Sequence, residues 1–244
     1  MATFVPLHTA DALILRTYKL GEADRIVVFL TRDRGKKRGV AKGARRPRSR
    51  FTGALEPLTH VRVAYFERER RELVGLNYAE TVRSPLALIG PPTGGPCDDA
   101  RRPVRGDRLP AAQTADALGC VGYFAELLDE CAQEADADDR LYRLGASMLD
   151  ALAAGVPVEP LARYFEYWLL RLQGVYPESR GSLSDGALQF LAESRAVPPH
   201  RVGEVPADRR VLRELENVHR TLIAMHLEKT LKSDRVLRDL RRHA

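Results

Sequence analysis

The chain has 244 residues, of which 44% are hydrophobic and 30% are charged, and three are cysteines. This length suits one large domain or two modest ones, and aliphatic residues recur too often for a disordered chain. No run of 18 apolar residues predicts a membrane span. The N-terminal stretch lacks a charged region and a cleavage site typical of a secretory signal. Three cysteines exclude a disulfide scaffold and indicate a reducing compartment.

Positive charge is concentrated at the N-terminal end. Residues 1–90 hold 18 Lys and Arg against 9 Asp and Glu, a net charge of +9. The other 154 residues hold 21 against 24, a net charge of −3. Such asymmetry favours a polyanionic partner for the N-terminal part, most often nucleic acid.

The first 82 residues have the pattern of short strands. Apolar or alternating runs separated by turn residues predict strands at Ala12–Tyr18, Arg25–Arg32, Arg38–Gly43, Val61–Phe66 and Glu72–Val82. Gly35 is expected to supply the positive φ of a tight turn between the second and third strands. Five strands in about 70 residues, with no convincing helix among them, indicate a small closed or nearly closed sheet.

The pattern changes after residue 83. Gly90–Pro110 is rich in Pro and Gly and is interpreted as a linker or surface loop. Apolar stripes at helical spacing then predict a helical bundle, with Thr114 as the first N-cap. The stripes run through Leu118–Cys131, Leu141–Leu152, Leu161–Leu172 and Leu212–Leu231, with a weaker helix at Ser184–Arg195 and a last short one after Ser233.

The sharpest local feature is the segment Arg32–Arg50. Its 19 residues include ten Lys or Arg side chains, and only Asp33 opposes them. Like charges this close repel one another, so the segment needs a counter-charge, which a phosphate backbone supplies with release of bound ions. A solvated basic hairpin is the alternative, and the concentration of charge favours nucleic acid. Phe51, beside the basic segment, is the best candidate for stacking on a base, although strand aromatics more often belong to a core.

Several segments of the sequence resemble a known family. The segments GEADRI (Gly21–Ile26), TRDRGK (Thr31–Lys36), KGARRPRSRF (Lys42–Phe51), GALEPL (Gly53–Leu58) and HLEKTLKSDRVLRDL (His226–Leu240) are similar to RecO, the bacterial recombination mediator. The similarity is dense over residues 10–82 and weaker over the helical half. It implies an α+β-type protein, with an OB-fold DNA-binding domain at 1–83, a linker or loop at 84–113 and a helical domain at 114–244.

The resemblance also implies a function. Family members take part in DNA repair and homologous recombination in the RecF pathway, bind single- and double-stranded DNA, anneal complementary strands and help load the recombinase. The implied partners are DNA, RecR, RecA and the single-strand-binding protein, inside the bacterial cell at the nucleoid, with no membrane. On this basis the expected DNA-contacting residues are Lys36, Lys37, Arg38, Lys42, Arg45, Arg46, Arg48 and Arg50.

The sequence departs from many members of that family in its cysteines. Several members carry two Cys-x-x-Cys pairs that form a zinc knuckle, whereas Gly174–Gly181 passes through the corresponding place without a cysteine. Cys97, Cys120 and Cys131 are 23 and 11 residues apart, which is not the spacing of metal ligands. No zinc and no other cofactor are expected, and Cys120 and Cys131 are predicted to be small core residues.

Enzyme motifs are not found in the sequence. A P-loop, a dinucleotide-binding glycine motif and a nucleophile elbow are all missing, so the chain is not expected to be an enzyme. His219 and His226 are interpreted as partial core residues rather than ligands. Seven carboxylates between Glu126 and Asp139 leave open a Mg²⁺-dependent nuclease, although a solvated helix face and helix-start charges are favoured. An RNA-binding OB protein is the other alternative.

A second basic group lies near the C-terminus. Arg235 and Arg238 are three residues apart and fall near one face of the expected last helix. They could bind the acidic tail of a single-strand-binding protein beside an apolar groove, or simply complement the helix dipole. The sequence favours neither of these two interpretations over the other.

Overall fold

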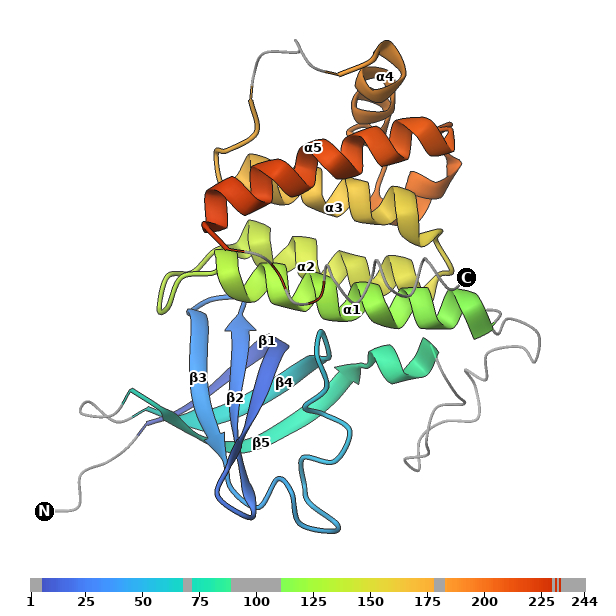
Figure 1. The fold of residues 1–244 in the computed structure, drawn as a ribbon. Helices are drawn as coiled ribbons and strands as arrows, with labels where there is room; N and C mark the ends of the chain where they lie inside the picture. Colours follow the sequence, from blue (N-terminus) through green and yellow to red (C-terminus); the bar gives the residue numbers. More distant parts are fainter. Residues whose placement is uncertain are drawn as a thin grey trace, which may run out of the picture.

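The computed structural model describes residues 6–67, 72–88, 111–177 and 183–229, together with residues 231 and 233. A barrel of strands forms the N-terminal part, and layers of helices stand on one end of it (Figure 1). The elements are β1 (Leu7–Leu20), β2 (Asp24–Thr31), β3 (Gly35–Ala41), β4 (His60–Phe66), β5 (Val74–Arg83), the 3-10 helix η1 (Pro85–Leu88), α1 (Ala111–Cys131), α2 (Asp139–Ala153), α3 (Val158–Leu172), α4 (Asp185–Ser194), the 3-10 helix η2 (Pro199–Glu204) and α5 (Arg209–Leu227).

The five strands close into a barrel in the order β1-β2-β3-β5-β4. β1 pairs with β2 through its second half and with β4 through its first half, so that one long strand joins the two sides. The β3–β5 pairing is parallel, and the other pairings are antiparallel. A five-stranded barrel with this order is the OB-fold. The fold class expected from the sequence is therefore confirmed.

The strand bounds differ from the expected ones where pairing extends past the apolar run. β1 begins at Leu7, five residues before the expected Ala12, because residues 7–13 pair with β4. β3 begins at Gly35 rather than Arg38. Gly35 does adopt a positive φ of 67°, and a Cβ there would overlap the backbone of Asp136. Only glycine allows the turn and this close approach of the helical part together.

Two hydrophobic cores meet at the wall of the barrel. Val61, Val63 and Tyr65 point inward from β4 and pack with Phe29 inside the barrel, as their alternation predicted. The second core lies among the helices. It also includes side chains from the outer face of the barrel, namely Leu13, Leu15, Val28, Leu30 and Leu58. The barrel and the helices therefore share buried apolar surface.

The helices form layers above the barrel. α1 and α2 contact β1, α3 packs over α1 and α2, α5 packs on α3, and α4 lies beyond α5 (Figure 1). Thr114 is not the N-cap of the first helix, because α1 begins at Ala111, before this residue. Asp138 caps α2 through the amides of Arg140 and Leu141, and Ser184 caps α4 through the amide of Ala187. α5 ends at Leu227 because Glu228 adopts a left-handed φ of 52°, which stops the expected run to Leu231.

Candidate nucleic-acid interface

The expected DNA-contacting residues lie on β3 and on the loop that joins β3 to β4. Residues 42–59 form this loop, called the basic loop from here on. It consists of successive turns, including hydrogen bonds from Arg46 N to Gly43 O at 3.1 Å and from Ser49 N to Arg46 O at 3.2 Å. The loop begins at the end of the barrel away from the helices and climbs back along its side toward them (Figure 1). Leu58, near the end of the loop, belongs to the core shared with the helices, whereas Arg45, Arg46 and Arg48 in its first part are exposed.

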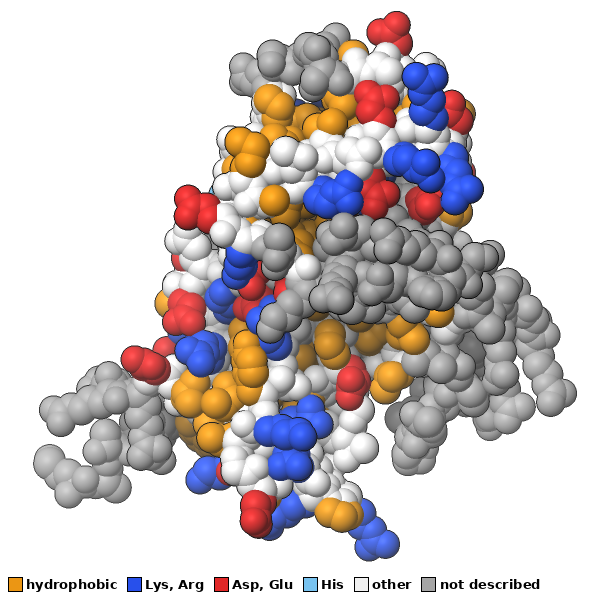
Figure 2. All heavy atoms as spheres, in the orientation of Figure 1, with side chains coloured by type: hydrophobic (Ala, Val, Ile, Leu, Met, Phe, Trp, Pro, Cys, Tyr) orange, Lys and Arg blue, Asp and Glu red, His pale blue; other side chains and the backbone are white. Residues whose placement is uncertain are grey.

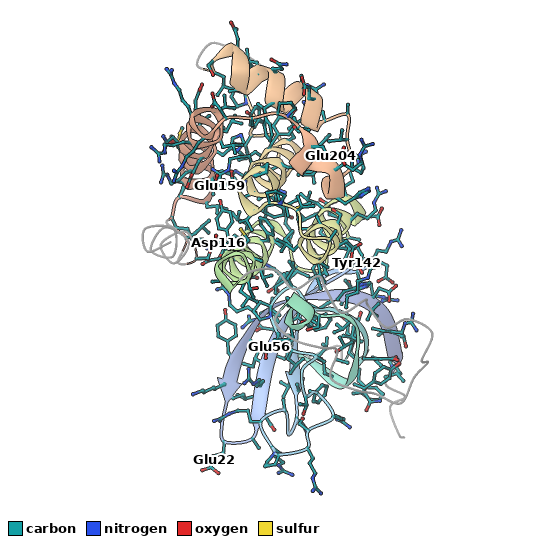
Figure 3. The ribbon with its side chains drawn as sticks, turned by 90° about the vertical axis from the view of Figure 1, so that its right-hand side faces the viewer. Glu22, Glu56, Asp116, Tyr142, Glu159 and Glu204 are labelled. Carbon is teal, nitrogen blue, oxygen red and sulfur yellow. The ribbon has the colours of Figure 1, made fainter. Side chains whose placement is uncertain are left out.

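The basic loop is anchored to the barrel at two places. Phe51, Ala54 and Leu55 belong to the core inside the barrel, which holds the middle of the loop down. Arg45 reaches across to the β1–β2 turn, where its backbone amide donates to Ala23 O at 2.9 Å and its side chain donates to Gly21 O at 2.9 Å. Glu22, in that turn, marks the end of the barrel opposite the helices (Figure 3). The two loops thus form one surface.

Phe51, the best stacking candidate in the sequence, lies instead in the core, where strand aromatics more often belong. Its side chain is only 2% exposed and belongs to the barrel core, and the guanidinium of Arg50 lies 5.1 Å from the centre of its ring. A ring covered in this way has no free face for a base. The adjacent sequence is strongly cationic, but the direction in which Phe51 points depends on packing that adjacent residues do not reveal.

The eight expected cations divide into two groups. Lys36 lies 3.5 Å from Oδ1 of Asp129 and donates to its backbone oxygen at 2.6 Å, while Lys37 lies 2.9 Å from Oε1 of Glu67. That hydrogen bond from Lys37 lowers the pKa of the Glu67 carboxyl. Both lysines are thus turned toward carboxylates of the protein itself.

The other six cations face solvent. These are Arg38, Lys42, Arg45, Arg46, Arg48 and Arg50, and all six are exposed. Within the part of the chain that the structure describes, no Asp or Glu forms an ion pair with any of them, in contrast to Lys36 and Lys37. Figure 2 shows Lys and Arg side chains at the lower end of the barrel. These six cations are therefore available to an anionic partner from outside the described residues.

The acidic cluster of the helical part is occupied by cations and caps. Arg16 on β1 lies 3.7 Å from Glu126, 3.2 Å from Asp129 and 3.7 Å from Glu130. Burial lowers the pKa of Arg16, but its hydrogen bond with Tyr18 and the carboxylates of Asp129 and Glu126 outweigh that effect and raise the pKa. Asp138 caps α2, and Asp139 pairs with Arg32 at 2.8 Å.

Five of the seven carboxylates of the cluster therefore already pair with a cation or cap a helix. Among the described residues, no group of three or more His, Cys, Asp or Glu side chains is placed to hold a metal ion. Carboxylates that already neutralise arginine and lysine are poor Mg²⁺ ligands, because the cation would have to displace those partners. The observation favours the helix-face interpretation over the nuclease.

The two histidines of α5 have different surroundings. His219 is 0% exposed, with its Nδ1 3.0 Å from Glu166 and its Nε2 3.3 Å from the hydroxyl of Tyr176. Burial raises the pKa of Glu166, but Arg163 and His219 outweigh it and lower the pKa. The core interpretation of His219 is confirmed. That of His226 is wrong, because its side chain is exposed.

Two of the cysteines, Cys120 and Cys131, were expected in the core. Cys120 is fully buried in α1, and Cys131, the last residue of α1, packs partly buried against the helical core. Burial raises the pKa of the Cys131 thiol to about 12. Cys97, most of the expected linker, and the expected partner-binding residues Arg235 and Arg238 lie outside the described residues.

The structure defines a two-part protein, an OB barrel with an exposed cationic end followed by a helical bundle. The comparisons with known proteins make this more specific. The family model described as Recombination protein O N terminal matches residues 3–85, and the one described as Recombination protein O C terminal matches residues 112–182.

Curated relatives agree with these family models. The chain is 38% identical over 172 residues to the DNA repair protein RecO of Koribacter versatilis, which covers 70% of this chain and 61% of the relative. It is 37% identical over 165 residues to the DNA repair protein RecO of an Anaeromyxobacter species, covering 68% of this chain and 56% of the relative. A Nocardioides RecO is 54% identical over 76 residues, which are 31% of this chain and 30% of the relative. The chain belongs to the RecO family.

The aligned region is thus shorter than two thirds of the first two relatives. Within the described residues, every helix is too short or too polar to cross a membrane.

Proposed function

We propose that this protein binds DNA in repair and homologous recombination through the RecF pathway, with the six exposed cations of β3 and the basic loop as its contacts to phosphates. The observation that carries the proposal is that these cations are exposed and unpaired among the described residues, while Lys36 and Lys37 face carboxylates of the protein. The names of the relatives, each a DNA repair protein, support the biological setting. On this proposal the DNA-binding domain spans residues 1–83, the linker begins at 84, and the helical domain begins with α1 at Ala111, three residues before the expected 114.

The finer activities follow from the same surface. Annealing requires two like-charged strands to approach each other, and a cationic surface lowers their repulsion without a nucleotide cofactor. Stacking in the new duplex, about 1.4 kcal/mol per base-pair step, then drives the reaction. We propose that the protein anneals complementary strands in this way and helps load the recombinase on protein-coated single strands, without a chemical step. RecR, RecA and the single-strand-binding protein are the proposed partners, inside the bacterial cell at the nucleoid.

The salt dependence of binding tests the phosphate contacts. If about four of the cations touch phosphates of a single strand, the logarithm of the affinity should fall with the logarithm of the salt concentration at a slope of about −3. Replacing Arg45, Arg46 and Arg48 with Ala should reduce this slope toward about −1 and weaken binding to all sequences alike, because contacts to the backbone carry no base readout. Fluorescence anisotropy of a labelled oligonucleotide measures both quantities.

A matched control removes the same charge elsewhere. Arg209, Arg210 and Arg213 are exposed near the start of α5, at the other end of the molecule. Replacing all three with Gln should leave the slope near that of the natural protein, because long-range charge is screened beyond about 10 Å at 0.1 M salt. Equal slopes for the two triple variants would contradict the assignment of the contacts.

Two further assays separate the alternatives. Fluorescent complementary oligonucleotides should anneal faster with the protein than without it. In competition, single-stranded DNA should displace the probe at least as well as RNA of the same sequence, whereas a reader of the 2′-hydroxyl would prefer RNA. Labelled DNA should stay intact during incubation with Mg²⁺, and cleavage would favour the nuclease.

The C-terminal arginines carry a separate proposal. We propose that Arg235 and Arg238 bind the acidic tail of the single-strand-binding protein, and reversing their charges should weaken binding of a tail peptide. Unchanged affinity would leave them as helix-end charges only.

A further inference from the structure

The strand register places a row of apolar side chains across the outer face of the barrel. Tyr18 on β1 is opposite Ile26 on β2, and Ile26 is opposite Val40 on β3. Residues directly opposite each other in a sheet share a face, so the three side chains lie side by side, with about 5 Å between neighbouring strands. Tyr18 is 44% exposed, and Ile26 and Val40 are partly exposed. None of them belongs to either hydrophobic core.

Cations border this row. Arg38 precedes Val40 by two residues on β3 and therefore points to the same face, and Lys42 follows Val40 by two residues. Both are exposed and belong to the group without an ion pair among the described residues. Figure 2 shows hydrophobic side chains gathered on the outer surface of the barrel with Lys and Arg side chains around them. An apolar strip beside free cations complements a ligand with flat apolar faces and a charged backbone.

The exposed ring of Tyr18 is held in position. Nη1 of Arg16 donates a hydrogen bond to its hydroxyl at 3.3 Å. Arg16 in turn is fixed by the three carboxylates of α1 described above. The tyrosine hydroxyl is therefore linked through Arg16 to the helical part, while the residue stays 44% exposed to solvent. An aromatic ring that is already ordered loses little side-chain entropy when a base stacks on it.

We infer that Tyr18 is a stacking platform for an unpaired base, with the phosphates of the same strand lying along Arg38 and Lys42. The inference rests on the proposed binding of nucleic acid and adds the surface that distinguishes single strands from duplexes. The bases of a duplex are stacked on one another and expose no face, whereas those of a single strand can turn onto a protein ring. Arg16 acts as the positioning residue for this ring.

Two probes that differ only in their bases test the inference. One is a labelled dT20 strand, and the other is a strand of 20 abasic sugar phosphates with the same label. Tyr18→Ala should weaken binding of dT20 by at least about 5-fold, the lower limit for one stacked base, and should leave the abasic strand unaffected. The salt slope should stay unchanged, because no phosphate contact is lost. Tyr18→Phe keeps the ring but loses the hydrogen bond from Arg16, so it should weaken binding of dT20 less than Tyr18→Ala does.

Tyr78 provides the matched control. It is also an exposed tyrosine, at 37%, but it lies on β5 opposite Ala64, away from the row. Tyr78→Ala should bind both strands as the natural protein does. Melting temperatures of all three variants check that the fold is kept.

The outcomes separate this inference from the proposed function. If Tyr18→Ala binds dT20 like the natural protein, while the triple Arg45, Arg46 and Arg48 variant is weakened, stacking is overturned and the row is left as a docking surface for a protein. Equal loss on dT20 and on the abasic strand would also overturn it, because the effect would then not need bases. If the natural protein binds neither strand, the proposed function itself fails.

Discussion

Arginines and lysines between Arg32 and Arg50 have different roles according to what lies opposite them. Arg32, Lys36 and Lys37 pair with carboxylates of the protein, and their charges help hold the barrel against the helices and β3 against the end of β4. The six cations from Arg38 to Arg50 face solvent. A run of like charges does not distinguish these two groups, because the opposing carboxylates are up to 107 residues away in the sequence.

Residue chemistry at the junction predicts a pH dependence of stability. His60 on β4 and Tyr142 on α2 share a hydrogen bond of 2.9 Å between Nε2 and the hydroxyl, and Tyr142 lies where the helices meet the barrel (Figure 3). Burial lowers the pKa of His60 below its usual 6.5. The unfolded chain therefore binds a proton at His60 more readily than the folded protein does. The contribution of neutral His60 to the free energy of unfolding is complete above pH 6.5, and it is lost as the pH falls toward the pKa of the folded state.

His60→Gln tests this dependence. At pH 7.5 the free energy of unfolding of the natural protein should exceed that of the variant by about 1 kcal/mol, the usual contribution of one hydrogen bond. The difference should shrink between pH 7 and pH 5, because protonation affects only the natural protein. Urea unfolding at several pH values measures the free energies. A difference that stays constant with pH would contradict the lowered pKa.

At the scale of elements, strand and helix types follow from local pattern, whereas their ends depend on partners. The alternation of Val61, Val63 and Tyr65 was enough to predict β4, because period two is a local property. The start of β1 was not predictable in this way, since Leu7 is in a strand only because it pairs with Phe66. Similarly, the acidic residues just before α2 include its N-cap, Asp138, and composition alone did not distinguish this residue from its acidic neighbours.

The cap of α2 leads to a prediction at this scale. Oδ1 of Asp138 accepts hydrogen bonds from Arg140 N and Leu141 N, both at 2.9 Å. Asp138→Ala should lower the free energy of unfolding by about 1 kcal/mol. DNA affinity should not change, because the cap is remote from the basic loop. Asp136→Ala, at an exposed neighbouring carboxylate, is the control and should change stability by less than half as much. Equal losses would mean that charge, and not capping, is responsible.

At the scale of the whole molecule, the barrel and the helices form one packed body. Leu13 points outward from β1 and is completely buried in the helical core. A Cβ added to Gly145 on α2 would lie only 2.7 Å from side-chain atoms of Leu13 and of Leu128 on α1. The glycine therefore allows α2 to approach both neighbours closely. Such contact predicts that the two parts unfold together.

Leu13→Ala tests this coupling. A buried Leu→Ala change costs about 2–5 kcal/mol. Two measurements should give the same loss in the free energy of unfolding. Trp168 fluorescence reports on α3, and hydrogen exchange of the amides of β4 reports on the barrel. Leu86→Ala, at a side chain that is 44% exposed in η1, should cost less than about 1 kcal/mol. Loss confined to the barrel amides would show two independent units.

The sequence by itself determined those features that depend on residues close together along the chain. Periodicity and turn residues such as Gly35 predicted five strands followed by helices, charge composition predicted a cationic N-terminal part, and short motifs carried the family resemblance. The tertiary structure decided which side chains are free. It buried Phe51, exposed and tethered Tyr18, and paired Lys36 and Lys37 with carboxylates, while leaving Arg45 and its neighbours open. The physical reason is that exposure and ion pairing depend on residues brought together by folding, which can lie far apart along the chain.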